Sequence, residues 1–281
     1  MDLAAYFDRI GFTGEARPDL ATLRAVHRAH LQAIPYDSLD VQLGRSLTID
    51  PAAAYDKIVG RRRGGWCYEM NGLMGWALSE IGFSVTRMAG AAMRAERGDS
   101  TIGNHLVLRI DLPGEPNPWI ADVGFGDGML DPFALRPADL EAEGHRFRLE
   151  AMDAGWWRFH NHEFGGAKSF DFTLAPADPA LLAEKCAWLQ SAPDSPFVMN
   201  VICQRWRGDE ILQLLGRTYR QIRPGVRGER VIASADEMIA VLRDDFTLDV
   251  PEAEALWPGI VARHEQVLAE AAAKGAETAD A

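Results

Sequence analysis

The sequence is poor in cysteine and has no long apolar run. Its three cysteines are Cys67, Cys186 and Cys203, and no two of them form a Cys-x-x-Cys pair. This spacing argues against a disulfide framework or a structural zinc site, so we expect reduced thiols. No apolar stretch approaches the roughly 20 residues that cross a bilayer. The acidic N-terminus lacks the basic and apolar regions of a secretory signal, so the sequence predicts a cytoplasmic protein without a membrane partner.

Basic residues are also scarce. The 29 Lys and Arg residues against 41 Asp and Glu residues give a formal net charge of −12. Because phosphate binding needs at least a local basic excess, this balance argues against nucleic acid as the main partner. The one dense basic run is Arg61–Arg63, which is either a solvated loop or a patch that meets an anionic group near Cys67.

What the sequence does contain is a glycine-rich turn followed by a helical pattern. Two glycines come shortly before Cys67, and the apolar residues that follow it recur every three or four positions: Met70, Leu73, Met74, Ala77, Leu78 and Ile81. This spacing predicts a helix that begins near Cys67 and ends at Gly82. The helix dipole favours an anion at this end, so we expect a lowered pKa for the Cys67 thiol. The alternative is that Cys67 is a small core residue.

Two polar residues further along the chain give this cysteine a possible catalytic role. His105 follows Cys67 by 38 residues, and Asp122 follows His105 by 17. Both lie in apolar runs that predict strands, and residues on neighbouring strands can face the same way. A thiol, an imidazole and a carboxylate form a catalytic triad wherever they meet in space. The sequence therefore predicts Cys67 as nucleophile, His105 as its base and Asp122 as the group that orients the imidazole.

The pattern along the chain changes from helices to short strands and then to a mixture. Helices are predicted from Leu20, over 51–59, over 178–190, and after a capping box at Ser234–Glu237. Strands are predicted over 83–94, 104–112, 118–123, 145–152, 156–162, 169–174, 198–206 and 211–222. His160 and His162 share a strand face but lack a third ligand at a set spacing, so no metal site is predicted.

Three segments carry a resemblance to a known family. They read Arg-Gly-Gly-Trp-Cys-Tyr-Glu-Met-Asn-Gly-Leu over 63–73, Asn-His-Leu-Val-Leu over 104–108, and Ala-Asp-Val-Gly-Phe-Gly over 121–126. In order and spacing they resemble the arylamine N-acetyltransferase family. The segments 6–11, 34–39 and 188–197 also resemble that family, so the likeness covers nearly the whole chain.

The resemblance implies an α+β fold in three parts. These are an N-terminal helical bundle over 1–82 that carries the nucleophile, a central antiparallel β-barrel over 83–190 that carries His105 and Asp122, and a C-terminal α/β lid over 191–281. The resemblance also implies a core like that of papain-type thiol enzymes. The order of helices, strands and then a mixture is also what the residue pattern predicts.

The resemblance further implies acetyl transfer from acetyl-coenzyme A, without a metal. Cys67 would hold the acetyl group as a thioester and pass it, in ping-pong kinetics, to an arylamine, an arylhydrazine or an N-hydroxyarylamine. A thiolate exchanges readily with a thioester, which suits this chemistry. The alternatives that stay open are a thiol hydrolase or transglutaminase-like enzyme, an amide synthase of the same fold, and a binding module that has lost activity.

Further site residues follow from the same resemblance. In the family, an asparagine that matches Asn71 steadies the aspartate, and a glutamate pairs with the arginine four residues before the cysteine. Here Asp37 stands in place of that glutamate and would have to reach Arg63 with a side chain one methylene shorter. The loop Gly124-Phe125-Gly126 is the predicted coenzyme contact, because its glycines allow close approach of a ligand. Phe125 and Trp66 would line an apolar cleft or serve as plain core aromatics.

Overall fold

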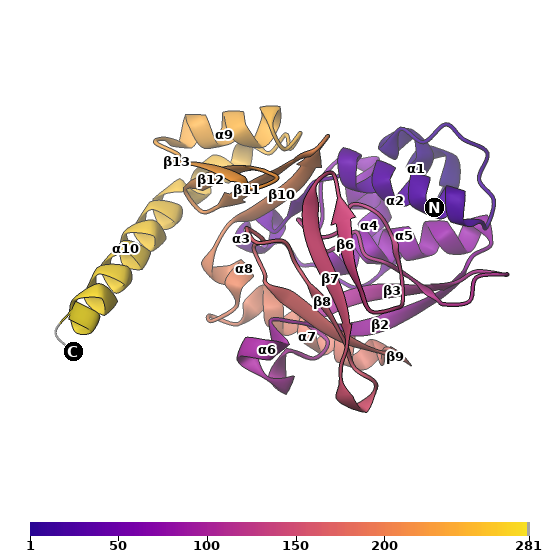
Figure 1. Ribbon diagram of the computed structural model, residues 1–281. Helices are drawn as coiled ribbons and strands as arrows, with labels where there is room; N and C mark the ends of the chain where they lie inside the picture. Colours follow the sequence, from indigo (N-terminus) through magenta and orange to yellow (C-terminus); the bar gives the residue numbers. More distant parts are fainter. Residues whose placement is uncertain (280–281) are drawn as a thin grey trace.

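The computed structural model describes residues 1–279, in which the chain forms a mixed α+β fold. Helices from the N-terminal part flank a curled eight-stranded antiparallel sheet, and a second, five-stranded sheet lies between the first sheet and the C-terminal helix (Figure 1). Over the described residues, no helix is both long and apolar enough to cross a membrane.

Three of the N-terminal helices begin where the sequence predicts, at Leu20, Pro51 and Cys67, whereas the helices over 3–10 and 39–42 were not predicted. The N-terminal helices are α1 (Leu3–Ile10), α2 (Leu20–Ala33), α3 (Leu39–Gln42), α4 (Pro51–Tyr55), the π-helix η1 (Asp56–Gly60) and α5 (Cys67–Ile81). The carboxylate of Asp19 accepts a hydrogen bond from the N–H of Thr22 and so caps α2. The expected single helix over 51–59 is wrong in its second half, which widens into η1. The wide turn places Lys57 among buried carboxylates, and sequence periodicity does not report such a tertiary contact.

The large sheet contains every strand predicted between residues 83 and 174. Its order is β5-β4-β3-β2-β9-β8-β7-β6. The strands are β2 (Ser84–Ala92), β3 (His105–Asp111), β4 (Trp119–Ala121), β5 (Phe133–Ala134), β6 (Ala138–Ala142), β7 (His145–Ala151), β8 (Trp157–His160) and β9 (Ser169–Pro176). Two strands were not predicted: β5 has only two residues, and β6 reads Ala-Asp-Leu-Glu-Ala, which carries little apolar alternation.

The smaller sheet joins the beginning of the chain to its last third. Its order is β1-β10-β11-β12-β13, with β1 (Tyr36–Asp37), β10 (Ile202–Arg207), β11 (Glu210–Leu215), β12 (Thr218–Arg223) and β13 (Val226–Val231). The predicted single strand over 211–222 is wrong, because the chain turns at Gly216, where φ is +55°, and β12 folds back on β11. The predicted strand over 198–206 begins late, since α8 (Pro196–Met199) precedes β10. A two-residue strand between α2 and α3 thus shares a sheet with the C-terminal third.

The remaining helices connect or follow the strands of the two sheets, and the last two share a hydrophobic core with the smaller sheet. They are α6 (Arg94–Arg97), α7 (Pro179–Ser191), α9 (Ala235–Asp244) and α10 (Trp257–Ala279), which follows the 3-10 turn η4 (Pro251–Leu256). As predicted, a helix begins after Ser234, whose hydroxyl accepts the N–H of Glu237.

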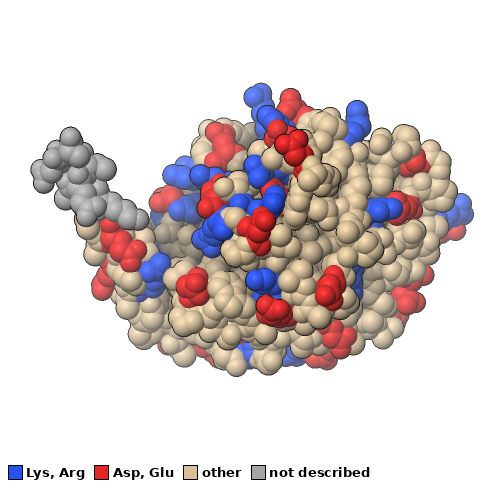
Figure 2. All heavy atoms as spheres, turned by 90° about the horizontal axis from the view of Figure 1, so that it is seen from below, with Lys and Arg blue, Asp and Glu red and all other residues tan. Residues whose placement is uncertain are grey.

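Acidic and basic side chains are interspersed over the face seen in Figure 2. The division at residues 82 and 190 stays a prediction, although helices give way to strands between Ile81 and Ser84.

Candidate active site

Cys67 is the first residue of α5 and is buried, with 3% of its surface exposed. The turn before it is closed by a capping interaction, in which the N–H of Trp66 donates to Oε2 of Glu69 at 3.2 Å. Nζ of Lys57 lies 2.8 Å from the same oxygen. The sequence prediction that Cys67 begins a helix is therefore confirmed, and a buried ion pair fixes the turn that presents it.

His105 and Asp122 lie on neighbouring strands, as expected. His105 begins β3 and Asp122 directly follows β4, which pairs with β3. Nε2 of His105 lies 2.7 Å from Oδ2 of Asp122. Burial alone would raise the pKa of Asp122, but the imidazole, the amide of Asn71 and the N–H of Gly124 together lower it. Because a carboxylate can only accept, Nε2 of His105 carries the hydrogen and Nδ1 is left free for other chemistry.

Asn71 lies one helical turn after Cys67 and holds Asp122 in place. Its Nδ2 donates to Oδ1 of Asp122 at 2.7 Å and to the carbonyl of Leu106 at 2.5 Å. Its Oδ1 accepts the N–H of Val123 at 2.9 Å. The side chain of Asn71 therefore links α5 to both strands of the site. The family resemblance implied this contact with Asp122.

The thiol of Cys67 lies beside the strand that carries His105. Sγ of Cys67 is 3.9 Å from the carbonyl oxygen of Asn104, the residue before His105, and both Cys67 and His105 line one cavity. Burial raises the pKa of Cys67, and the nearby Cys186 and Asp122 raise it further, whereas backbone N–H groups act weakly in the opposite direction. The helix end was expected to lower this pKa, and that expectation is wrong, because burial has the larger effect.

A further histidine, His27 on α2, supports the backbone of Asp122. Nε2 of His27 accepts the backbone N–H of Asp122 at 3.2 Å, and its Nδ1 donates to the carbonyl of Leu130 at 2.9 Å. Burial lowers the pKa of His27, so the neutral ring is retained. His27 therefore holds the backbone of Asp122 from behind. The only sequence signal was its place on the apolar face of α2.

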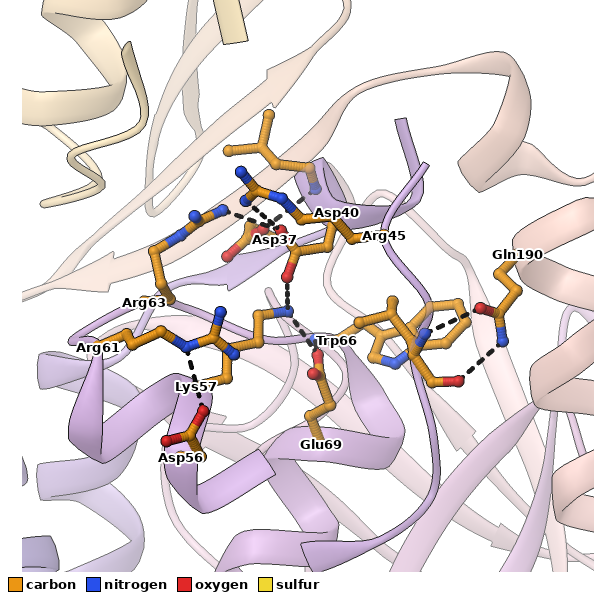
Figure 3. A network of polar contacts seen from close by, with 12 residues as sticks. Asp37, Asp40, Arg45, Asp56, Lys57, Arg61, Arg63, Trp66, Glu69 and Gln190 are labelled. Carbon is orange, nitrogen blue, oxygen red and sulfur yellow. Dashed lines mark hydrogen bonds and ion pairs between the residues drawn. The ribbon is translucent and has the colours of Figure 1, made fainter. Parts of the chain in front are cut away.

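Arg63 and Asp37 do not form the expected ion pair. Nη2 of Arg63 lies 3.1 Å from Oδ1 of Asp40, and Nζ of Lys57 lies 2.9 Å from Oδ2 of the same carboxylate (Figure 3). Oδ1 of Asp37 instead accepts the N–H of Leu39 at 3.0 Å. The shorter side chain of Asp37 thus caps its own turn, and Asp40, three residues later, supplies the buried negative charge that Arg63 needs.

The cavity has a volume of about 630 Å³ and lies between the large sheet, α7 and the smaller sheet. Cys67, His105, Gly124 and Phe125 form its floor, and apolar side chains from α7, α8 and the smaller sheet form much of its wall. Its charged lining residues are Arg97, Lys185, Arg220 and Asp194. In a chain with a net charge of −12, a cavity with three cations and one carboxylate suits an anionic ligand.

The glycine loop after Asp122 packs against the nucleophile. A Cβ at Gly124 would lie 2.7 Å from Cα of Cys67, so only glycine fits there. Phe125 lies edge-on to the imidazole of His105, with ring centroids 5.3 Å apart. Gly126 does not line the cavity but lies against the carboxamide of Gln204. For Trp66 the sequence allowed two roles, in the wall of a cleft or in the core, and its side chain is fully buried.

Comparison with known proteins places the chain among transferases. A family model described as N-acetyltransferase matches residues 19–255. An arylamine N-acetyltransferase of Mycolicibacterium smegmatis is 34% identical over 265 residues, which cover 89% of this chain and 93% of that protein. The liver isozyme of arylamine N-acetyltransferase from Gallus gallus is 32% identical over 276 residues, which cover 88% of this chain and 96% of that protein.

The fold agrees with the same assignment. The structure of Mycobacterium marinum arylamine N-acetyltransferase in complex with CoA superposes with a TM-score of 0.83 at 28% identity, covering 93% of this chain and 98% of that one. The Salmonella typhimurium enzyme gives a TM-score of 0.81 at 27% identity, covering 92% and 98%. The chain belongs to the arylamine N-acetyltransferase family, which confirms the resemblance seen in its motifs.

Proposed function

We propose that this protein transfers the acetyl group of acetyl-coenzyme A to aromatic amines and hydrazines through a thioester on Cys67. The observation that carries the proposal is the hydrogen-bonded set of His105, Asp122 and Asn71 beside a buried cysteine, in a cavity large enough for a substrate. Family membership supplies the reaction class, and relatives with the same fold include one solved in complex with CoA.

In the first half-reaction, the thiol of Cys67 attacks the acetyl carbonyl. Its proton passes to Nδ1 of His105, which is free because Nε2 donates to Asp122. The new carbon–sulfur bond forms as the bond to the coenzyme sulfur breaks, and the departing thiolate takes the proton back from the imidazolium. Because burial raises the pKa of the thiol, His105 must accept its proton for the sulfur to attack.

In the second half-reaction, an aromatic amine enters after the coenzyme has left. The amine nitrogen attacks the thioester while Nδ1 of His105 accepts its proton, and the Cys67 thiolate is released and reprotonated. Aromatic amines are uncharged at neutral pH, so they enter an apolar cavity at low cost. The acceptors are arylamines, arylhydrazines and N-hydroxyarylamines, and the kinetics are ping-pong.

The coenzyme takes the same cavity as the acceptor, one after the other. Its acyl end lies over Gly124 and Phe125, with Gly126 behind them, and its phosphates meet the cationic rim formed by Arg97, Lys185 and Arg220. The helix that begins at the nucleophile and the two strands that bear base and carboxylate resemble the core of papain-type thiol enzymes. Arg63 and Asp37 serve as structural support near that helix.

The test is a mass spectrum after brief exposure to acetyl-coenzyme A alone. We expect a stable gain of one acetyl group on the intact protein, located on Cys67, and none on Cys67→Ala. Cys186→Ala, which removes another buried thiol, is the control and should still gain the group. Steady release of coenzyme A without an amine would instead support a thiol hydrolase, and absence of any acetyl gain in the wild type would refute the proposal.

A further inference from the structure

One wall of the cavity carries polar side chains that the proposed reaction does not use. Gln204 on β10 and Gln213 on β11 are cross-strand partners, and both line the cavity although they are 8% and 3% exposed. They stand next to apolar residues of the same sheet, such as Ile202 and Leu215. A buried carboxamide is costly unless it is hydrogen-bonded, so the partners of these two groups indicate what each presents to a ligand.

The orientation of the Gln213 carboxamide is fixed by a buried carboxylate. Nε2 of Gln213 donates to Oδ2 of Asp127 at 2.7 Å and to the carbonyl of Phe164 at 3.2 Å, which uses both of its hydrogens. Asp127 is fully buried and also accepts Nδ2 of Asn161 at 2.9 Å and the N–H of Gly166 at 2.6 Å. Because a carboxylate cannot donate, Gln213 cannot turn its amide around.

Gln213 therefore presents only an acceptor to the cavity. Within residues 1–279 its Oε1 receives no hydrogen bond, and it is not among the buried side-chain oxygens that lack a partner, so it is open to the cavity. Arg220, the next residue across the sheet, is bound through Nε to Glu229 at 2.7 Å. A ligand group that satisfies Oε1 of Gln213 must carry an O–H or an N–H.

The loop from Gly124 to Asp127 connects the surroundings of Cys67 to Gln213. Gly124 packs on Cys67, Phe125 lies edge-on to His105, Gly126 lies against Gln204, and Asp127 binds Gln213. Four consecutive residues span at most about 11 Å between their Cα atoms. A single aromatic ring with one substituent is shorter than this limit, and Cys67, Phe125 and both glutamines line one cavity, so a ring on Phe125 with its amine at Cys67 can extend towards the wall that carries the glutamines.

We propose, on the basis of the acetyl transfer proposed above, that Gln213 selects acceptors whose ring carries an O–H or N–H donor opposite the amine. Such a donor pairs with Oε1 of Gln213. A methyl group at the same place leaves that buried acceptor without a partner, and a site built around a hydrogen bond discriminates against ligands that lack it. Asp127 is the positioning residue that keeps the acceptor pointed at the ligand.

The experiment compares kcat/KM for para-aminophenol and para-toluidine, whose hydroxyl and methyl groups are similar in size. The ratio of the two values is measured in the wild type and in Gln213→Met, so that the intrinsic reactivity of each amine cancels. We expect the ratio to fall on the order of tenfold in Gln213→Met. This factor corresponds to the free energy of one hydrogen bond between neutral groups. Para-anisidine, which has the oxygen but no donor, should behave like para-toluidine.

A matched control separates this role from a general loss of activity. Gln221→Met makes the same change on β12, where Gln221 is exposed and does not line the cavity, and should leave the ratio unchanged. If Gln213→Met does not fold, Gln213→Asn withdraws the carbonyl by one methylene and should lower the ratio in the same direction. A ratio that is equal in wild type and variant overturns the selection by Gln213. Failure of the wild type to acetylate any of the three amines would instead refute the proposed function.

Discussion

At the level of single residues, the site depends on hydrogen bonds that hold Asp122 as an ionised acceptor. His105, Asn71 and the N–H of Gly124 all donate to its carboxylate, and His27 accepts its backbone N–H. The consequence is one tautomer of His105, with Nδ1 available to the nucleophile. The position of the His105 ring is therefore set by hydrogen bonds among buried groups.

Replacing Asp122 by Asn is expected to lower kcat by about four orders of magnitude with little change in stability. The amide keeps the shape of the carboxylate but favours the wrong tautomer of His105, an effect known for this kind of triad. Single-turnover acetyl transfer checks the rate, and thermal unfolding checks the fold. Asp111→Asn, at a carboxylate with 40% of its side chain exposed, is the control and should leave kcat unchanged. A loss of less than tenfold in Asp122→Asn would contradict the role.

Acid is expected to destabilise the protein below about pH 6.5. Burial lowers the pKa of His27 and lowers that of His30 well below its ordinary value, so the folded rings stay neutral while the unfolded chain binds protons near pH 6.5. Stability therefore falls as pH decreases through this window, by up to about 1.4 kcal/mol per pH unit for each histidine. Urea unfolding at several pH values measures the slope of the unfolding free energy against pH. His27→Gln, which does not titrate, should make it shallower; an unchanged slope would contradict the assignment.

At the level of elements, the helix that carries Cys67 is fixed by buried charges on its neighbours. Lys57 extends from η1 to Asp40 on α3 and to Glu69 on α5, and its side chain is 3% exposed (Figure 3). Glu69 in turn caps the turn at Trp66. Three elements thus meet on one ammonium group, and Cys67 lies two residues from Glu69.

Lys57→Met is expected to destabilise the protein by about 3–5 kcal/mol, because it leaves the buried carboxylate of Glu69 without a cation and removes one of the cations that surround Asp40. Arg61→Gln is the matched control, since Arg61 pairs with Asp56 on the surface, where the two side chains are 57% and 73% exposed. That change should cost less than about 1 kcal/mol. Urea unfolding of both variants gives the comparison. Similar losses in the two variants would show that burial of the cluster does not matter.

At the level of the whole molecule, the smaller sheet contributes Trp206, Ile211 and Ile222 to the main core, and Trp206 is the largest of these side chains. Trp206 on β10 is fully buried in the main core, and its Nε1 donates to the carbonyl of Gly128 at 3.0 Å. The pairing of β1 with β10 adds a backbone connection between the first and last thirds of the chain. The cavity lies at this junction, so its shape depends on how the two sheets meet.

Trp206→Ala is expected to cost about 3–5 kcal/mol through the cavity that it leaves. Trp188→Ala, at a tryptophan that is 44% exposed, should cost far less. Unfolding followed by two probes, far-ultraviolet circular dichroism and tryptophan fluorescence, shows whether the smaller sheet then unfolds first. Equal losses in the two variants would contradict the contribution of Trp206 to the main core.

Local patterns in the sequence predicted much of this structure. The spacing of apolar residues after Cys67 predicted α5, Asp19 and Ser234 predicted where two helices begin, and alternation predicted most of the large sheet. The predictions failed where a tertiary contact or a short turn decides the outcome. The expected helix over 51–59 widens at η1, where Lys57 meets buried carboxylates, and Gly216 divides the expected strand over 211–222 into two.

By itself, the sequence determined the family, the helix that starts at Cys67 and the three residues expected to act together, because each is encoded in short segments. Only the tertiary structure decided the partners of those residues. His27 lies 95 positions from Asp122, and Gln213 lies 86 positions from Asp127. Contacts at such separations have no local period, since they depend on how whole sheets and helices pack. For the same reason, Arg63 binds Asp40, although the motif pointed to Asp37.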